Sequence, residues 1–256
     1  MKGIESRVVI VTGAGSGIGR AAAKLFGKNG AKVVVGDMNK EGGEETAHQI
    51  EKEGGQCIFV PVDVSKSDDV EAMVKSGVSR FGGVDLAFNN AGVALGGALH
   101  EISEEIWSKV IDINLKGVWL CMKYEIPEML KRGAGAIVNT ASIAGHQADV
   151  FSPVYTASKH GILGLTQSAA LQYAAYGIRV NAVSPGIIST PMSASLESDA
   201  GMKEWLMGRI AADRIGNPEE VAQAAVWLCS DGASYVMGHS LVVDGGFLSG
   251  PPFNQK

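Results

Sequence analysis

Short runs of β-branched and apolar residues alternate along the 256-residue chain with longer segments of helical period. Seven such runs predict strands, at residues 7–11, 32–36, 56–61, 84–88, 135–140, 178–184 and 240–243. Strands that alternate with helices form right-handed βαβ crossovers, which produce a parallel sheet with helices on both faces. The sequence therefore predicts a single α/β domain over residues 1–256, a doubly wound sheet of the Rossmann type with seven parallel strands.

The composition argues against several kinds of partner. A formal net charge of -5 without a run of Lys or Arg offers no surface for nucleic acid. No stretch of about 18 uncharged apolar residues is present to span a membrane, and the N-terminus has no signal-length apolar core. The cysteines at 57, 121 and 229 are widely separated and the histidines lack ligand spacing, so we expect free thiols and no metal. We expect a soluble, cytoplasmic protein.

A glycine-rich loop, TGAGSGIG at Thr12 to Gly19, follows the first predicted strand and opens a helical segment. It departs from the GxGxxG fingerprint because Ile18 stands where the third glycine belongs. The backbone N–H groups and the helix dipole at such a turn can face a pyrophosphate, although a bare strand–turn–helix explains the glycines equally well. Asp37 strengthens the prediction of a nucleotide site, because an acid 20 residues after Gly17 can accept hydrogen bonds from an adenosine ribose. Its alternative role is to cap the following helix.

Two further strand ends carry polar or small residues. Asp63 follows the third strand, and the sequence AFNNAG ends the fourth with Asn89 to Gly92. The carboxyl ends of parallel strands meet at one edge of the sheet, where ligands bind, so these residues predict a track for adenosine. For Asp63 the alternative is again a helix cap.

The stretch SPVYTASKHG places Tyr155 and Lys159 four residues apart at the start of a helical segment, so both side chains share one face. Ser142 lies thirteen residues before Tyr155, at the end of another strand on the same edge. A phenol with a pKa of about 10 is a poor base at neutral pH, but a nearby ammonium group lowers that pKa. The three residues therefore predict an acid–base site.

These motifs together resemble those of the short-chain dehydrogenase/reductase family, over almost the whole chain and in order. The family's glycine motif TGxxxGxG corresponds to Thr12–Gly19, which explains the departure from GxGxxG. The remaining correspondences are NNAG at Asn89–Gly92, the helix asparagine at Asn114 in DINLKG, the serine at Ser142, YxxxK at Tyr155–Lys159, and PG followed by Thr at Pro185, Gly186 and Thr190.

The resemblance implies a mechanism. Tyr155 exchanges a proton with the substrate oxygen, which Ser142 holds, while hydride passes between the carbinol carbon and the nicotinamide. Lys159 binds the nicotinamide ribose and favours the Tyr155 phenolate, and Asn114 links Lys159 to solvent through a water at a kinked helix. The resemblance also implies a homotetramer or a dimer that packs the helices near residues 104–130 and 154–176 against symmetry mates.

The cofactor that the resemblance implies is a nicotinamide dinucleotide, and Asp37 favours NAD because a carboxylate would repel a 2′-phosphate and Met38, not Arg, follows it. The residues expected to bind it are Gly13, Ser16, Gly17, Ile18, Gly19, Asp37, Asp63, Val64, Asn90, Tyr155, Lys159, Gly186, Ile188 and Thr190.

The expected function is an NAD-dependent alcohol dehydrogenase or ketone reductase. One alternative is an NADPH-dependent 3-oxoacyl carrier-protein reductase, against which Asp37 argues. Another is a nucleotide-binding regulator without turnover, against which the complete set of Ser142, Tyr155 and Lys159 argues.

The segment 189–212 breaks the strand–helix rhythm and is either a substrate lid or a helical cap on the core. The candidate substrate pocket shows no basic clamp, so we expect a neutral, hydrophobic secondary alcohol or ketone. Its residues are mostly apolar: Val93, Leu95, Ile143, Gln147, Val150, Phe151, Ile187, Met192, Trp205 and Leu206.

Overall fold

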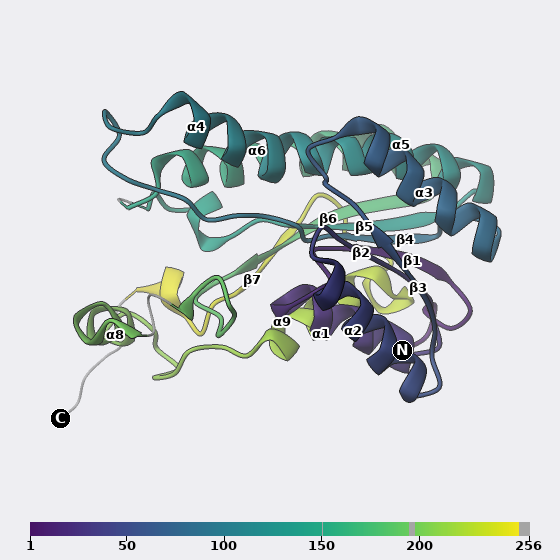
Figure 1. Cartoon of the computed structure of the whole chain (residues 1–256), viewed down its shortest axis with the longest axis horizontal. Helices are drawn as coiled ribbons and strands as arrows, with labels where there is room; N and C mark the ends of the chain where they lie inside the picture. The colour runs from purple at the N-terminus through teal and green to yellow at the C-terminus, as the bar shows by residue number, and fades with distance from the viewer. Residues whose placement is uncertain (150, 195–197, 251–256) are drawn as a thin grey trace.

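The computed structural model describes residues 1–149, 151–194 and 198–250, and it contains one seven-stranded sheet in which every neighbouring pair is parallel. The strands follow the order β3-β2-β1-β4-β5-β6-β7 across the sheet (Figure 1). Their bounds are β1 (Val8–Thr12), β2 (Lys32–Asp37), β3 (Gln56–Pro61), β4 (Leu86–Asn89), β5 (Gly135–Thr140), β6 (Ile178–Pro185) and β7 (Ser240–Val243). The predicted strands are confirmed to within two residues at each end.

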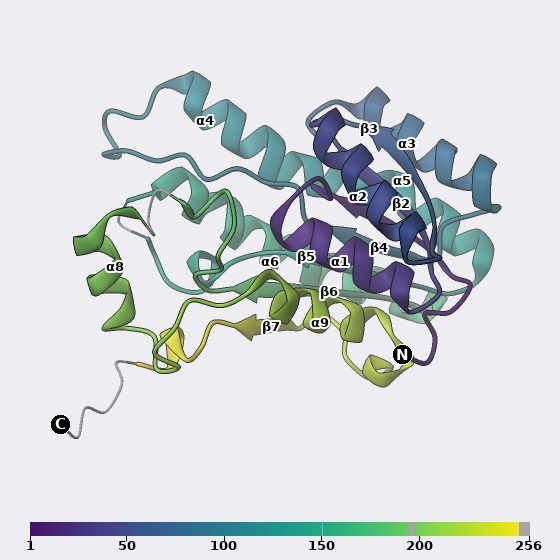
Figure 2. The same cartoon turned by 60° about the horizontal axis from the view of Figure 1, so that its bottom comes forward.

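Helices cover both faces of the sheet, as Figures 1 and 2 show. One face carries α1 (Gly17–Lys28), α2 (Lys40–Lys52) and α9 (Pro218–Cys229). The other carries α3 (Ser67–Phe81), α4 (Glu104–Ile111), α5 (Gly117–Arg132) and α6 (Pro153–Tyr173). The central strand β1 is buried at every position because its β-branched side chains pack under helices on both faces. The expected α/β sandwich is therefore confirmed.

Shorter helical turns complete the chain. They are the π-helical turn η1 (Asp112–Lys116), the 3₁₀ turns η2 (Ile143–Gly145), η3 (Ala174–Tyr176), η4 (Asp231–Ala233) and η5 (Phe247–Ser249), and the helix α8 (Ala200–Met207). Among the described residues, no helix is long and apolar enough to cross a membrane. The three cysteines are buried and free.

The order of the strands places the ligand crevice. The chain proceeds outward from β1 to β2 and β3, then returns to add β4 on the other side of β1. The loops after β1 and β4 consequently diverge to opposite faces, and the gap between them is the topological switch point at which doubly wound sheets bind ligands.

The segment after β6 leaves the sheet and carries α8 to one end of the molecule, away from α1 and α2 in both views (Figures 1 and 2). It returns to the sheet layer at α9, whose start is fixed by a capping box of Asn217 and Glu220. The segment predicted as a lid is thus helical in part; its residues 195–197 lie outside the described residues.

Candidate active site

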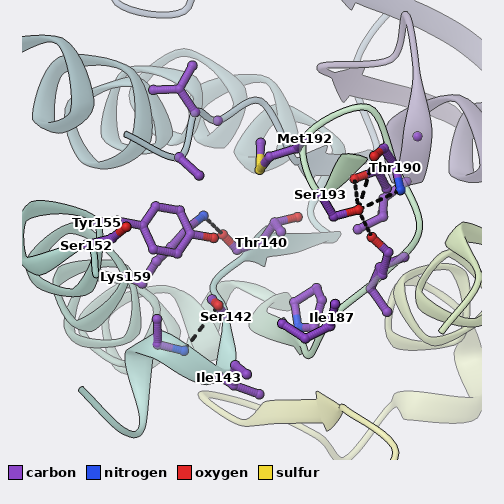
Figure 3. A pocket seen from close by; sticks show the side chains of 18 of the residues that line it. Thr140, Ser142, Ile143, Ser152, Tyr155, Lys159, Ile187, Thr190, Met192 and Ser193 are labelled. Atoms are coloured by element: carbon purple, nitrogen blue, oxygen red, sulfur yellow. Dashed lines mark hydrogen bonds between the residues drawn. The ribbon is translucent and has the colours of Figure 1, made fainter. Parts of the chain in front are cut away.

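A cavity of about 800 Å³ opens at the carboxyl edge of the sheet. Its wall runs from the glycine loop after β1, past the ends of β2 to β6, to α8 and η5. A close view shows Tyr155, Lys159 and Thr140 on one side of the cavity, across from Thr190 and its neighbours on the segment after β6 (Figure 3). One cavity thus joins most of the residues that the sequence analysis singled out.

The glycine loop is shaped for a close backbone approach to a ligand. Gly13 and Gly17 have φ of 64° and 49°, a left-handed conformation that residues with a side chain rarely adopt. Both glycines line the cavity together with Ser16 and Ile18, and Gly17 stands at the first position of α1. The start of the helix therefore presents its N–H groups and its positive dipole end to the cavity, which suits a pyrophosphate.

Gly19 lies behind this surface and does not line the cavity. A Cβ atom at Gly19 would lie 2.0 Å from the carbonyl oxygen of Gly13. Gly19 thus allows α1 to pack closely against its own loop, and its contribution to ligand binding is indirect.

The NNAG turn after β4 holds the glycine loop in place. The Thr12 hydroxyl accepts hydrogen bonds from the backbone N–H groups of Asn90 (3.0 Å) and Ala91 (3.1 Å). In return, the Asn90 amide donates to the carbonyl oxygens of Thr12 (3.2 Å) and Gly13 (3.3 Å). Asn90 also lines the cavity, as predicted, so it both supports the loop and faces the ligand space.

Asp37, at the end of β2, lines the cavity as expected. Its Oδ2 accepts a hydrogen bond from the Gly15 N–H at 2.7 Å and its Oδ1 accepts one from the Asn39 N–H at 2.8 Å. The capping alternative is wrong, because the residue that caps α2 is Asn39, which accepts from the Gly42 N–H. The carboxylate instead joins the glycine loop to the end of β2.

Asp63 and Val64 lie just beyond β3 and both line the cavity. The Asp63 carboxylate accepts hydrogen bonds from the Ser65 N–H (3.1 Å) and hydroxyl (2.7 Å). The residue at the N-cap position of α3 is Lys66, so the capping alternative for Asp63 is wrong as well.

The predicted catalytic residues Ser142, Tyr155 and Lys159 lie together. The Lys159 ammonium donates to the Thr140 carbonyl oxygen at 2.7 Å and lies 5.3 Å from the centroid of the Tyr155 ring (Figure 3). Ser142 follows β5, and its hydroxyl accepts from the Ala144 N–H at 3.1 Å and lowers the pKa of Tyr155. One face of α6 and the end of β5 therefore bring Ser142, Tyr155 and Lys159 close together in space.

Burial dominates the protonation of this group. It raises the pKa of Tyr155 above its ordinary value, which the Ser142 hydroxyl partly offsets and the nearby Asp149 carboxylate reinforces. It also lowers the pKa of Lys159 to about 7. The sequence-based expectation that Lys159 lowers the pKa of Tyr155 does not describe this structure, because desolvation dominates the pKa of both groups: Lys159 is buried and Tyr155 is half-buried in the cavity wall.

Asn114 lies in the π-helical turn η1 and is fully buried behind the cavity wall. Its amide oxygen accepts from the Val93 N–H at 2.8 Å, and its amide nitrogen donates to the Val93 carbonyl (2.9 Å) and the Ser158 hydroxyl (3.2 Å). Asn114 and Lys159 both approach Gly92: an added Cβ there would lie 3.2 Å from Asn114 Oδ1 and 3.8 Å from Lys159 Nζ. The kink predicted around Asn114 is present as a π turn, a feature frequent at functional sites.

Beyond β6, Gly186, Ile188 and Thr190 line the cavity as expected. The Thr190 N–H donates to the Ser193 hydroxyl at 3.0 Å, and that hydroxyl donates to the Ile188 carbonyl at 2.7 Å. This turn holds Thr190 beside the glycine loop, with Thr190 Cγ2 3.1 Å from the position of a Cβ on Gly17.

Most of the residues expected to form the substrate pocket line the cavity, with two exceptions and one omission. Leu95 does not line the cavity, and Val150 lies outside the described residues. The omission is Arg209, which lines the cavity and contradicts the expectation that no basic side chain does so at this end. The signal in the sequence was its position, because Arg209 lies within the segment 189–212, four residues after the pocket candidate Trp205. The candidate pocket residues that do line the cavity are Val93, Ile143, Gln147, Phe151, Ile187, Met192, Trp205 and Leu206.

Comparisons with known proteins agree with this architecture. A family model described as "Enoyl-(Acyl carrier protein) reductase" matches residues 13–248. The chain is similar to 2,5-dichloro-2,5-cyclohexadiene-1,4-diol dehydrogenase of Sphingobium indicum, with 44% identity over 252 residues covering 97% of this chain and 100% of the relative. It is also similar to cyclohexanol dehydrogenase of an Acinetobacter species, with 45% identity over 247 residues and 96% of each chain covered.

A third relative, cis-4-hydroxycyclohexanecarboxylate dehydrogenase of Sinomonas cyclohexanicum, is 44% identical over 244 residues, which cover 95% of this chain and 97% of the relative. Among solved structures, a putative 2-deoxy-D-gluconate 3-dehydrogenase from Agrobacterium tumefaciens with bound NADP superimposes with a TM-score of 0.89 at 38% identity, over 96% of this chain and 97% of that one. The doubly wound fold and these matches define an α/β oxidoreductase. The chain belongs to the short-chain dehydrogenase/reductase family.

Proposed function

We propose that this protein is an NAD-dependent dehydrogenase of alicyclic secondary alcohols, acting reversibly on the corresponding ketones. The observation that carries the cofactor preference is the Asp37 carboxylate in the cavity wall. Among the described residues that line the cavity, the basic ones are Lys159, beside Tyr155, and Arg209, next to α8. A 2′-phosphate near Asp37 would therefore meet a carboxylate and no cation, which disfavours NADP.

The substrate class follows from the cavity and the relatives. The wall facing Tyr155 is largely apolar, which suits a ring or chain of carbons. Three relatives are named for alcohols on six-membered carbon rings. The alternative of an NADPH-dependent 3-oxoacyl carrier-protein reductase is disfavoured by Asp37, and that of a regulator without turnover by the assembled Ser142, Tyr155 and Lys159.

The residues present fit a nicotinamide dinucleotide. Gly13, Ser16, Gly17 and Ile18 would hold the pyrophosphate at the start of α1 because they surround a helix N-terminus and carry little bulk. The remaining contacts would follow the cavity wall from the adenosine end to the nicotinamide end: Asp37, Asp63, Val64, Asn90, Tyr155, Lys159, Gly186, Ile188 and Thr190. When bound, the oxidised cofactor accepts the hydride that leaves the carbinol carbon.

The proton chemistry belongs to the chain itself. In alcohol oxidation, Tyr155 takes the hydroxyl proton while the Ser142 hydroxyl holds the substrate oxygen. Lys159, with a pKa lowered to about 7, changes its protonation near neutral pH and so can pass a proton on. In the proposed relay, Asn114 holds a water on the far side of Lys159 and connects it to solvent. Its place beside Lys159 around Gly92 supports this role.

The proposed assembly is a homotetramer. Large apolar side chains are exposed on the outer helices: Trp107 (47%) on α4, Trp119 (47%) and Leu130 (40%) on α5, and Leu171 (85%) on α6. Exposed apolar side chains gathered on neighbouring helices are typical of contact surfaces between protein chains. In the same proposal the segment 189–212 closes over bound substrate as a lid, supported by Met192, Met202 and Trp205 in the cavity wall.

The test is a panel of alcohols assayed for formation of the reduced cofactor at 340 nm, with NAD and NADP in parallel. The panel contains cyclohexanol, a linear secondary alcohol of equal carbon number and a primary alcohol. We expect turnover of cyclohexanol with NAD and kcat/KM at least about 100-fold lower with NADP, because an unpaired phosphate facing a carboxylate costs several kcal/mol. Turnover with NADP alone would refute the cofactor proposal, and no turnover of any alcohol would refute the activity.

A further inference from the structure

One end of the cavity carries a cation that the proposed chemistry does not use. Arg209 lies two residues after α8 and lines the cavity with its half-buried side chain. The guanidinium carbon lies 5.0 Å from the centroid of the Trp205 ring and 4.8 Å from that of Phe247. Two aromatic rings on different elements, α8 and η5, thus hold the planar group in place.

No carboxylate balances this charge in the part of the chain that the structure describes. Within residues 1–149, 151–194 and 198–250, no salt bridge or hydrogen bond joins the Arg209 guanidinium to another residue. Asp149 also lines the cavity, but its carboxylate accepts a hydrogen bond from the Phe151 N–H at 2.9 Å and so stabilises the turn of its own loop. By contrast, Arg214, a few residues further on, forms a two-pronged ion pair with Glu220 at 2.6 and 2.8 Å. Arg209 therefore retains its full capacity to donate hydrogen bonds.

The separation of Arg209 from Tyr155 determines which part of a substrate Arg209 can bind. The ring of Phe151, four residues before Tyr155, contacts Trp205 edge-to-face with centroids 6.1 Å apart, and Arg209 lies on Trp205. One indole ring thus separates Arg209 from the loop that leads into the Tyr155 helix. A group bound to Arg209 belongs to the part of the substrate remote from the carbinol carbon.

A structural explanation alone does not account for this arrangement. An arginine that only joined α8 to η5 would be expected to find a carboxylate or a carbonyl oxygen for its five N–H groups, as Arg214 does. The guanidinium instead stacks on apolar rings, which lower the local polarity without using any N–H group. This surrounding strengthens a charge-assisted hydrogen bond to an incoming anion, and the fork of N–H groups matches a carboxylate.

We propose that Arg209 binds a carboxylate of the substrate, so that the preferred substrates are alicyclic hydroxy acids, or the corresponding keto acids, with the acid group across the ring from the carbinol carbon. This inference rests on the proposed function for the site of hydride transfer. It differs from the expectation from the sequence, which was a neutral substrate. Phe247 and Trp205 then have two roles: they orient the guanidinium and they form the wall for the ring.

The experiment measures binding without turnover. The enzyme loaded with NADH is titrated by calorimetry with cyclohexanecarboxylate and with its neutral analogue cyclohexanecarboxamide, neither of which has a hydroxyl to oxidise. We expect the carboxylate to bind at least about 10-fold more tightly than the carboxamide, the range of a charge-assisted hydrogen bond. Arg209→Gln should abolish this preference, while Arg209→Lys should retain part of it because the charge remains.

The matched control is Lys203→Gln, which removes an exposed positive charge from α8, the helix that precedes Arg209. It should leave the preference unchanged. Equal affinity of the wild type for the two ligands, or a preference that survives in Arg209→Gln, would overturn the inference. So would a loss of NADH affinity in Arg209→Gln, since that places the guanidinium on the cofactor. Oxidation of cyclohexanol with NAD by the wild type tests the proposed function separately, so the two can fail independently.

Discussion

Glu125 on α5 is a buried acid whose titration should appear in the stability of the protein. Its side chain is fully buried, and Oε2 accepts a hydrogen bond from the Asn89 amide at 3.1 Å. The same amide donates to Asn139 Oδ1 at 3.1 Å, and Asn139 donates to Thr166 at 3.0 Å. Within the described residues, Glu125 Oε1 and Asn89 Oδ1 have no hydrogen-bond partner. This network joins α5 and α6 to the ends of β4 and β5, where the cavity begins.

The size of this effect on the unfolding free energy follows from the pKa of Glu125. Burial raises the pKa of Glu125 from 4.5 to about 8, against which the hydrogen bond from Asn89 acts. Between these two values the unfolded chain has lost the proton and the folded protein keeps it, so stability falls as pH rises. Each pH unit costs about 1.4 kcal/mol, and the whole interval about 5 kcal/mol. Below pH 4.5 and above pH 8 this residue contributes no further change.

The perturbation is Glu125→Gln, which keeps the size of the side chain and removes the titration. Urea unfolding of both proteins at pH 5, 6.5 and 8 gives the difference in unfolding free energy, in which the other titrating groups cancel. We expect the unfolding free energy of the variant, relative to that of the wild type, to increase steadily from pH 5 to pH 8, by about 4 kcal/mol in total. Glu128→Gln serves as the control, because Glu128 lies on the same helix but pairs with Lys131 at the surface.

A difference between wild type and Glu125→Gln that stays constant across this pH range would refute the reasoning, since it would mean that Glu125 is ionised in the folded protein. The same conclusion would follow if Glu128→Gln produced an equal slope, because the effect would then belong to the charge of the helix rather than to the buried position.

Three other predictions test the site and the assembly. Asp37→Ala should lower kcat/KM with NAD and raise it with NADP; Asp37→Asn should also raise it with NADP, while its single amide oxygen keeps one of the two hydrogen bonds that Asp37 accepts from the N–H groups of Gly15 and Asn39. An unchanged ratio of the two cofactors in both variants would contradict the role of the carboxylate. Lys159→Met should abolish activity yet stabilise the protein without cofactor at pH 6 by several kcal/mol, because burial lowers the pKa of Lys159 to about 7 and the folded state holds an unfavourable charge below that value. This gain should shrink as pH rises from 7 towards 10.5, since the folded amine is then neutral while the unfolded amine is still charged; a gain that persists at high pH would refute the assignment. Light scattering at micromolar concentration should give about four times the 26.7 kDa of one chain, and a monomer would contradict the proposed tetramer.

Much of the fold was predictable because it depends on local patterns. The β-branched runs that became β1 and β2 are buried on both faces, so their sequence has no polar face to obscure the strand. The start of α9 was predictable from Asn217 and Pro218, because asparagine is favoured at the N-cap of a helix and proline at its first position. The π turn at Asp112–Lys116 was predictable only through the family motif, since one extra residue in a helical turn leaves little trace in hydrophobic periodicity.

The parts of the site that escaped prediction depend on contacts between distant segments. Glu125 reads as one more polar residue on an amphipathic helix, and its burial appears only when α5 lies on the sheet beside Asn89. Arg209 reads as a surface residue until η5 brings Phe247 against it. The sequence allowed Asp37 to cap the following helix, but the structure shows that the N-cap of α2 is Asn39, two residues later.

The central claim is that Tyr155 transfers the proton in an NAD-dependent alcohol oxidation, and Tyr155→Phe tests it most directly because the change removes one oxygen and keeps the ring. The measurement is kcat for cyclohexanol with NAD, followed at 340 nm, together with the Kd of NADH by fluorescence. We expect kcat to fall by at least about 100-fold, the typical loss of a general acid or base, while the Kd changes by less than about threefold. A variant that keeps turnover near the wild-type value would contradict the account.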